Sequence, residues 1–280
     1  MNKNATAETE RKSFRVWLEE EEHSRGTIEK YVRDVNQYCK WLNGGEMTKE
    51  SMMEWKERLL DRGYKASTIN AMIASLNAYC RYLKLPYKIR SLRVQRRLFR
   101  DERKELNRAE YNKLALTALK FGKTRTAMLI ETIGSTGIRV SEVKHITVEA
   151  ALCERAQISM KGKIRVIMLP HKLCRKLLQY AKIQKITTGE IFLTKTGKGI
   201  NRKQIWAEMK QICKEAGVPD QKVFPHNLRH LFAMEYYKST HDVVLLSDVL
   251  GHSSIETTRI YLITSGNEIA KQLENMKLVM

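Results

Sequence analysis

The stretch PHNLRHLFAMEYYKSTHDVVLLSDVLGHSSIETTRIY, residues 225–261, is the part of the chain around which the rest is organised. Pro225 favours a helix beginning here, because a proline in the first turn loses no intrahelical hydrogen bond. At about 100° per residue, one face of this helix carries His226, Arg229, His230 and Ala233. The opposite face carries Leu228, Leu231 and Phe232. The pattern predicts that the apolar face packs against the protein while the basic face lies toward a ligand.

The same stretch ends with a second helix signal and a tyrosine. Residues 253–256, SSIE, have the order of a capping box, in which a serine and a glutamate satisfy the first free backbone N–H groups. We expect a short helix here that carries Arg259 and Tyr261. Basic side chains and a potential nucleophile therefore occur together in one segment of 37 residues.

Length and charge limit the class of protein. With 280 residues the chain can form two domains, each with its own core. The formal net charge is +20, and both halves carry it: residues 1–100 hold 21 Lys and Arg against 13 Asp and Glu, and the remainder holds 30 against 18. The distribution predicts a polyanionic partner that both halves contact, although ribosomal and membrane-surface proteins are also basic.

The cysteines are odd in number and show no CxxC or Cys/His metal spacing. We interpret them as reduced core residues of a cytoplasmic protein: Cys39, Cys80, Cys153, Cys174 and Cys213. No apolar run approaches the roughly 18 residues of a membrane span, and the polar start of the chain is not a secretory signal. We therefore expect an intracellular protein with no metal site and no membrane contact.

The first domain is predicted to be helical and to cover residues 1–88. Helices are expected at 8–22, 27–42, 49–62 and 67–83, with glycines at the breaks. In the second of these, apolar residues recur at three- and four-residue spacing from Ile28 to Leu42, as one buried helix face requires. A small helical bundle is the simplest packing.

Residues 89–105 are predicted to form a basic linker. Ten Lys and Arg occur from Arg81 to Lys104, against Asp101 and Glu102. The segment is either a disordered spacer or, in a protein that binds DNA, a strip along the phosphate backbone. The DNA contacts predicted for the second alternative, together with one residue of the later hairpin, are Arg93, Arg96, Arg97, Arg100 and Lys163.

The second domain is expected over residues 106–280. Helices are predicted at 108–121, 124–133, 171–184 and 202–215, and a short strand at 191–193. After the second helix, two glycines permit a tight turn that puts Arg139 in the first turn of a new helix, where free N–H groups favour an anion. Glu142 lies three residues on and can hold the guanidinium. Taken alone, this motif is more often a surface ion pair.

A β-hairpin is predicted at residues 156–169, where apolar and polar side chains alternate. Its tip carries Lys161, Gly162 and Lys163. A basic hairpin tip usually does no more than face solvent. These lysines are therefore given a role only in combination with the other candidate residues.

Together, these residues fit the chemistry of a phosphodiester. Two arginines can bind its non-bridging oxygens, and preorganised donors there each contribute about 3 kcal/mol to transition-state stabilisation. Tyr261 would attack phosphorus, with His226 as proton acceptor and Arg229 as cation. Lys161 is a candidate general acid for the leaving sugar oxygen. The sequence has no carboxylate cluster for Mg²⁺ beside them, so we expect arginines in place of metal ions and no cofactor.

Four segments, in the order TGIRVSEV, KGKIR, HNLRHLFA and LGHSSIETTRIY, resemble the tyrosine recombinase family of phage integrases and Xer-type resolvases. In the first half, RGTIEKYVRDVNQYCKWL and KASTINAMIASLNAYCRYLK are similar to the family's helical core-binding domain. The resemblance implies a mainly α fold with a small β-sheet. An N-terminal SAM-like core-binding domain and an α+β catalytic domain would form a clamp around DNA.

The resemblance also implies the roles of individual residues. The catalytic set would be Arg139, Lys161, His226, Arg229, His252 and the nucleophile Tyr261, supported by Glu142 and His230. The hairpin tip is one residue shorter than the common form, so Lys163 is an alternative to Lys161. The core-binding pattern begins near the start of the chain, which implies a simple recombinase without an arm-binding domain.

Four copies would then hold two DNA duplexes at inverted-repeat sites and exchange strands through 3′-phosphotyrosine links and a Holliday junction, without ATP. The tail at 267–280 would pack on its own domain or dock on the neighbouring copy. Such an enzyme, for example one from a mobile genetic element, would be found in the cytoplasm with the nucleoid. Two alternatives stay open: a DNA-binding regulator on the same scaffold, and a type IB topoisomerase-like enzyme that relaxes DNA.

Overall fold

The computed structural model describes residues 13–93, 102–160, 163–252, 254–259, 261 and 274–276, with only the backbone of Glu102, Met160 and Lys163. The chain divides into two compact units, Met1–Arg96 and Arg97–Met280. Over the described residues it is mainly α-helical with one two-stranded sheet. This confirms the predicted fold class. No helix in the described ranges is long and apolar enough to cross a membrane.

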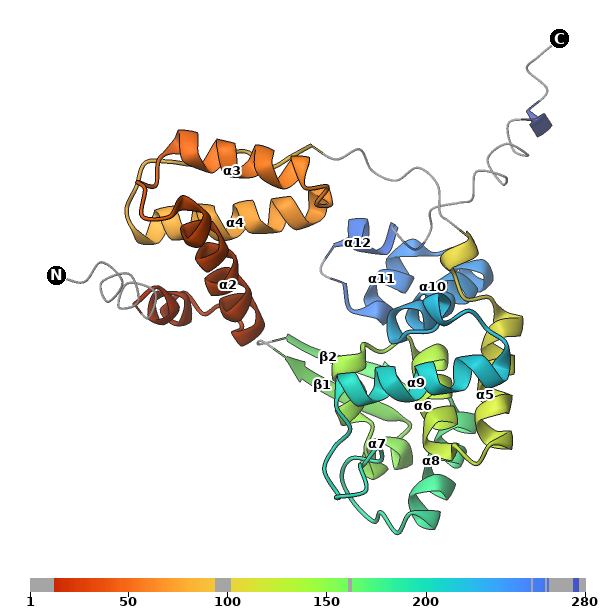
Figure 1. The fold of residues 1–280 in the computed structure, drawn as a ribbon. Helices are drawn as coiled ribbons and strands as arrows, with labels where there is room; N and C mark the ends of the chain where they lie inside the picture. The colour runs from red at the N-terminus through yellow and green to blue at the C-terminus, as the bar shows by residue number, and fades with distance from the viewer. Residues whose placement is uncertain are drawn as a thin grey trace. The chain divides into compact units, whose positions relative to one another are not determined.

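The N-terminal unit is a small helical bundle. Residues 13–20 are helical, and three longer helices follow: α2 (Arg25–Leu42), α3 (Lys49–Asp61) and α4 (Ala66–Tyr82) (Figure 1). Helix α4 packs against both α2 and α3. The core between them contains Tyr38, Ile69 and Leu76, none with more than 1% of its surface exposed. The apolar spacing in the sequence predicted these three helices within two residues at each end.

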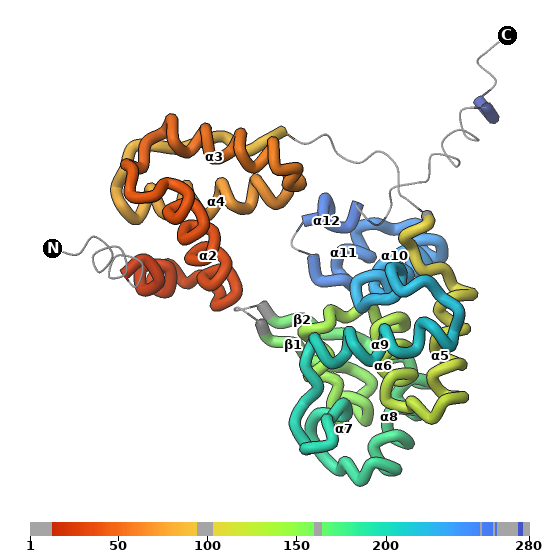
Figure 2. Tube along the Cα trace, viewed as in Figure 1, coloured from red at the N-terminus to blue at the C-terminus, as the bar shows by residue number. Residues whose placement is uncertain are grey.

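The C-terminal unit is built around one buried helix, α6. The helices of this unit are α5 (Arg108–Lys120), α6 (Thr124–Thr136), α7 (Val148–Leu152), α8 (His171–Ile183), α9 (Arg202–Ala216), α10 (Pro225–Thr240), α11 (Val243–Leu250) and α12 (Ile255–Arg259). Short 3-10 helices occur at η1 (Glu102–Lys104), η2 (Val140–His145) and η3 (Asp220–Lys222). Helix α6 contacts α5, α8, α9 and α10. Figure 2 shows α10, α11 and α12 together at one end of this unit, with α7 and α8 at the other.

The sheet is an antiparallel hairpin of β1 (Arg155–Met160) and β2 (Lys163–Met168). It confirms the predicted hairpin, whose tip at 161–162 lies outside the described residues. One face of the hairpin packs on the core and the other is exposed. Ala156, Ile158 and Ile167 are buried, whereas Ile164, Val166 and Met168 are all more than half exposed. Arg165, between two exposed neighbours, therefore points inward with the buried set.

Other predictions for this unit were incomplete or wrong. The strand predicted at 191–193 is not formed. Leu193 makes an isolated bridge with Gly199, and Glu190, just before the segment, makes one with Thr147. Helices α7 and α11 were not predicted, although Asp242 gives α11 a strong start by accepting hydrogen bonds of 2.9 Å from the N–H groups of Val244 and Leu245.

The cysteines are not all core residues. Cys80, Cys174 and Cys213 are buried, but Cys39 is half-buried and Cys153 is exposed. Cys153 directly follows Leu152, the last residue of α7, which is also exposed. The predicted tail helix at 267–280 lies outside the described residues except for 274–276.

Candidate active site

Helix α10 is packed on both of its faces. Leu228 and Leu231 are buried as predicted, but Arg229, on the face predicted to lie toward a ligand, is only 3% exposed. The reason is that Tyr261 and α11 pack over this face and form an apolar cluster with it. The prediction of an open basic face was therefore wrong for Arg229, although His226 on the same face is exposed.

Arg229 is held between the ends of two helices. Its Nη1 donates a hydrogen bond of 2.5 Å to the carbonyl oxygen of Gly137, which caps α6, and its Nη2 one of 2.8 Å to the carbonyl oxygen of Leu250, the last residue of α11. Helix C-termini carry partial negative charge and favour cations. Burial, and then the nearby Arg139, lower the pKa of Arg229, while the Tyr261 side chain counteracts this. A guanidinium nevertheless stays charged at neutral pH.

The C-terminus of α11 binds three arginines through three consecutive backbone carbonyls. The hydrogen bonds run from Arg165 Nη1 to Val249 (3.3 Å), from Arg229 Nη2 to Leu250 (2.8 Å) and from Arg139 Nη2 to Gly251 (3.0 Å). The last carbonyls of a helix have no intrahelical partner, so they are available to these side chains. The arginines come from β2, from α10 and from the turn before η2, and α11 brings them together.

Glu142 binds two of the same arginines. Its Oε1 accepts a 3.0 Å hydrogen bond from Arg139 Nη1, and its Oε2 accepts one of 2.6 Å from Arg165 Nη2. The side chain is 3% exposed, and a buried carboxylate is stable only when it is paired in this way. The predicted pairing of Arg139 with Glu142 is confirmed. The predicted position of Arg139 in a helical turn is wrong, because its backbone is extended and precedes η2.

His252 connects Arg229 to helix α12. Its Nε2 lies 2.9 Å from Arg229 Nη2, and its Nδ1 lies 2.8 Å from Thr258 Oγ1. Since arginine only donates, Nε2 must accept, and the proton of the neutral ring is on Nδ1, which donates to Thr258. Burial, followed by the three arginines, lowers the pKa of His252 to about 4. At neutral pH this histidine is therefore uncharged.

Tyr261 is buried beside three histidine rings. Its ring centroid lies 5.7 Å from that of His252, 5.8 Å from that of His226 and 5.2 Å from that of His230. Although His226 keeps an exposed edge, partial burial of its imidazole, together with Arg229, lowers the pKa of that histidine. His230 also faces Glu105, with 3.8 Å between Nε2 and Oε1. The phenol of Tyr261 therefore lies beside the buried guanidinium of Arg229. It is surrounded by three imidazoles, two of which have a lowered pKa, while the third, His230, faces a carboxylate.

The structure brings together most of the residues predicted from the sequence. Those gathered in this one site are Arg139, Glu142, His226, Arg229, His230, His252 and Tyr261. Lys161, Arg96, Arg97 and Arg100 lie outside the described residues, as does the side chain of Lys163, and Arg93 is exposed. Of the predicted capping box, Ser254 Oγ accepts a hydrogen bond of 3.3 Å from Glu256 N.

Two residues of the site were missed. Arg165 was missed because it lies inside an alternating strand pattern. Thr258 was missed because nothing distinguishes it from its neighbour Thr257 except burial. Among the described residues, His, Cys, Asp and Glu form no group of three that could hold a metal ion.

Two parts of the chain match known families. Residues 104–267 match the phage integrase family, and residues 13–85 match the N-terminal SAM-like domain of phage integrases. The chain therefore belongs to the phage integrase family, the tyrosine recombinases, which are enzymes that cleave and rejoin DNA.

Individual relatives agree with this assignment. Tyrosine recombinase XerA of Pyrococcus furiosus is 26% identical, covering 95% of this chain and 93% of its own. Tyrosine recombinase XerC of Roseiflexus castenholzii is 27% identical, covering 89% of this chain and 86% of its own. Among solved structures, a lambda integrase dimer bound to a COC′ core site has a TM-score of 0.70 at 16% identity, covering 89% of this chain and 93% of the integrase fragment. The fold is thus shared at low identity.

Proposed function

We propose that the protein is a site-specific recombinase that exchanges DNA strands through a covalent 3′-phosphotyrosine at Tyr261. The observation that carries this proposal is the position of the Tyr261 phenol against His226 and His252, beside the buried Arg229, in a chain of the phage integrase family. A phenol with a pKa near 10 needs a proton acceptor and a cation to attack phosphorus at neutral pH. Both are present around Tyr261.

In the proposed reaction, Arg139 and Arg229 bind the non-bridging oxygens of the scissile phosphate. The Tyr261 oxygen attacks phosphorus and its proton passes to His226, which is neutral because its pKa is lowered. The bond from phosphorus to the 5′-oxygen breaks, and Lys161, or Lys163 as the alternative, protonates that oxygen. The 3′-phosphotyrosine retains the energy of the original ester, so another strand's 5′-hydroxyl can reverse the step without ATP.

We further propose that the domains at 1–88 and 106–280, joined by the basic linker, close around double-stranded DNA as a clamp. The solved relatives include a lambda integrase tetramer bound to a Holliday junction, which supports four copies and a junction intermediate here. The proposal has three further parts. The target sites are inverted repeats, the protein acts in the cytoplasm on the nucleoid, and the tail at 267–280 docks on a neighbouring copy.

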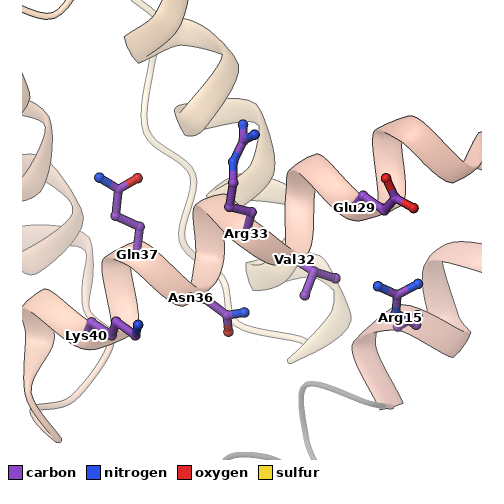
Figure 3. Close-up of a pocket in the computed structure, with 7 residues that line it drawn as sticks. All are labelled: Arg15, Glu29, Val32, Arg33, Asn36, Gln37 and Lys40. Carbon is purple, nitrogen blue, oxygen red and sulfur yellow. The ribbon is translucent and has the colours of Figure 1, made fainter. Parts of the chain in front are cut away.

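The N-terminal unit offers a surface suited to DNA. A hollow of about 530 Å³ runs along α2 and is lined by Arg15, Glu29, Val32, Arg33, Asn36, Gln37 and Lys40 (Figure 3). Three of these side chains are basic and can bind phosphates. The amides of Asn36 and Gln37 both donate and accept hydrogen bonds, which is what reading of base edges in the major groove requires.

A nicked suicide substrate tests the proposal, because the cut strand then loses a short fragment and the covalent adduct accumulates. With the enzyme's own target site, wild type should give a covalent adduct on a denaturing gel, whereas Tyr261→Phe should bind the DNA without forming one. Tyr237→Phe, at a half-buried tyrosine packed on the same apolar cluster, is the matched control and should form the adduct. Binding by wild type without any adduct would favour a regulator and refute the enzymatic proposal.

A further inference from the structure

Arg165 is the one arginine of the cluster that the proposed reaction does not use. It lies on β2 opposite Ile158 and points toward the buried side of the hairpin. Its side chain is 17% exposed. Both terminal nitrogens are bound within the protein, Nη2 to Glu142 and Nη1 to the carbonyl oxygen of Val249. Arg165 therefore connects the hairpin to the carboxylate that holds Arg139 and to the end of α11.

The carboxylate of Glu142 is shared between the two arginines. Oε2 accepts from Arg165 Nη2 at 2.6 Å and from the backbone N–H of Arg139 at 2.8 Å, while Oε1 accepts from Arg139 Nη1 at 3.0 Å. Because Oε2 is held by Arg165 and by the backbone N–H of Arg139, the other carboxylate oxygen, Oε1, has one orientation. That orientation fixes the guanidinium of Arg139.

The fit of Arg165 against α11 is tight. A Cβ on Gly251 would lie 2.4 Å from Arg165 Nη1 and 2.5 Å from its Cδ, far inside contact distance. Gly251 also has φ +62°, a left-handed conformation that disfavours other residues. The glycine thus leaves space for the arginine, and its own carbonyl binds Arg139.

We propose that Arg165 is a positioning residue for strand cleavage: it holds Glu142 and the end of α11, so that Arg139 is preset to bind the scissile phosphate. The inference rests on the proposed function, since Arg139 is a phosphate ligand only in that reaction. Arg165 itself does not contact the DNA. It acts through Glu142 and through the backbone of residues 249–251.

The first test measures adduct formation on the suicide substrate in a single turnover with saturating DNA. Arg165→Met should slow the rate constant about 10²-fold, as misplacement of a catalytic group does. DNA affinity, and its dependence on salt, should stay at wild-type values. Arg165→Lys keeps the charge but has one terminal nitrogen in place of the planar fork that reaches both Glu142 and the carbonyl of Val249, so it should recover only part of the rate. The inference is overturned if Arg165→Met binds DNA more weakly and the slope of log affinity against log salt falls by the amount expected for about one phosphate. Arg165 would then be a DNA ligand.

The second test leaves every charge in place. Gly251→Ala should displace the Arg165 guanidinium and slow cleavage about 10-fold, on the same reasoning about misplaced groups. The matched control is Gly217→Ala, which also replaces a left-handed helix-capping glycine (φ +56°) but meets only Lys113 Nζ, at 3.3 Å. That control should cleave at the wild-type rate. In a protein that already carries Arg165→Met, Gly251→Ala should not slow cleavage further, because both substitutions act on the same arginine. If the double variant is instead slower by the product of the two single effects, the two sites act independently and the proposal is contradicted.

A spectroscopic readout separates positioning from general loss of structure. Arg165 is one of the cations that depress the pKa of His252, so NMR titration of Arg165→Met should show that pKa raised with the remaining histidine signals unchanged. An unchanged His252 titration would mean that the arginine is not held beside the site. If wild type forms no adduct at all, the proposed function fails; if wild type and Arg165→Met form it at equal rates, only the positioning role of Arg165 fails.

Discussion

The imidazole of His252 lies nearly parallel to the phenol ring of Tyr261, with 9° between the two planes and 5.7 Å between the centroids. His226 and His230 approach the same phenol at steeper angles, 47° and 56°. Because both nitrogens of His252 are already bound, to Arg229 and Thr258, its ring cannot turn freely. The stacked pair therefore fixes the tyrosine relative to the buried arginine.

Thr258 should be needed for this arrangement. Thr258→Val keeps the shape of the side chain but removes the oxygen that accepts from His252 Nδ1, and an unsatisfied buried donor costs about 1–3 kcal/mol. We expect the free energy of unfolding in urea to fall by that amount and adduct formation to slow. Thr257→Val, at the exposed neighbour on α12, should change neither, and Thr258→Ser should restore the rate.

The stability of the protein should decline in weak acid. The pKa of His252 is lowered from 6.5 to about 4 in the folded protein, so below pH 6.5 the unfolded chain binds a proton that the folded chain does not. The stabilising contribution is complete above pH 6.5 and is lost as pH falls toward 4. Urea unfolding between pH 4 and 8 measures it. His252→Gln should show a shallower decline, and an identical decline would contradict this origin.

Gly137 should be intolerant of any side chain. It ends α6 with φ +63°, and an added Cβ would lie 2.4 Å from Cδ1 of Phe232. Gly137→Ala combines the left-handed penalty of about 1–2 kcal/mol with overpacking of about 1–3 kcal/mol. The control is Gly122→Ala, which has φ +69° but open space around it, and which should lose only the first amount. Equal losses in urea unfolding would show that Phe232 moves aside.

The basic linker should bind phosphates if it is more than a spacer. Replacing Arg93, Arg96, Arg97 and Arg100 with alanine should weaken DNA binding for all sequences alike. The slope of log affinity against log salt should fall by about 0.9 for each phosphate that the variant no longer neutralises. Fluorescence anisotropy from low to moderate salt measures the slope. A slope equal to that of wild type would leave the linker as a spacer.

The sequence predicted the helices well where one face is buried and one is solvated. The helix at 27–42, for instance, agrees with α2 to within two residues, because apolar residues recur at three- and four-residue spacing from Ile28 to Leu42. Periodicity assigns residues to a face but does not say what covers that face. For α10 the cover is formed by α11 and Tyr261, which lie further along the chain, so the burial of Arg229 followed from tertiary packing alone.

The same limit explains the hairpin. Its alternation predicted the strands but not which face packs on the core: the fold buries the face of Ile158 and Ile167 and leaves Ile164, Val166 and Met168 exposed. On the buried face, Arg165 binds Glu142 and the end of α11. Both partners are distant in the sequence, and nothing in the strand itself indicates them.

The three carbonyls at the end of α11 are main-chain atoms, so a side-chain substitution at Val249 does not remove the acceptor that Arg165 uses. Alanine scanning of α11 would therefore overlook this hydrogen bond. Inserting or deleting one residue within the helix would turn the following carbonyls by about 100° and move them away from all three arginines at once. Helix α11 is thus constrained in its length more than in its composition, and variation within it should take the form of substitutions without insertions or deletions.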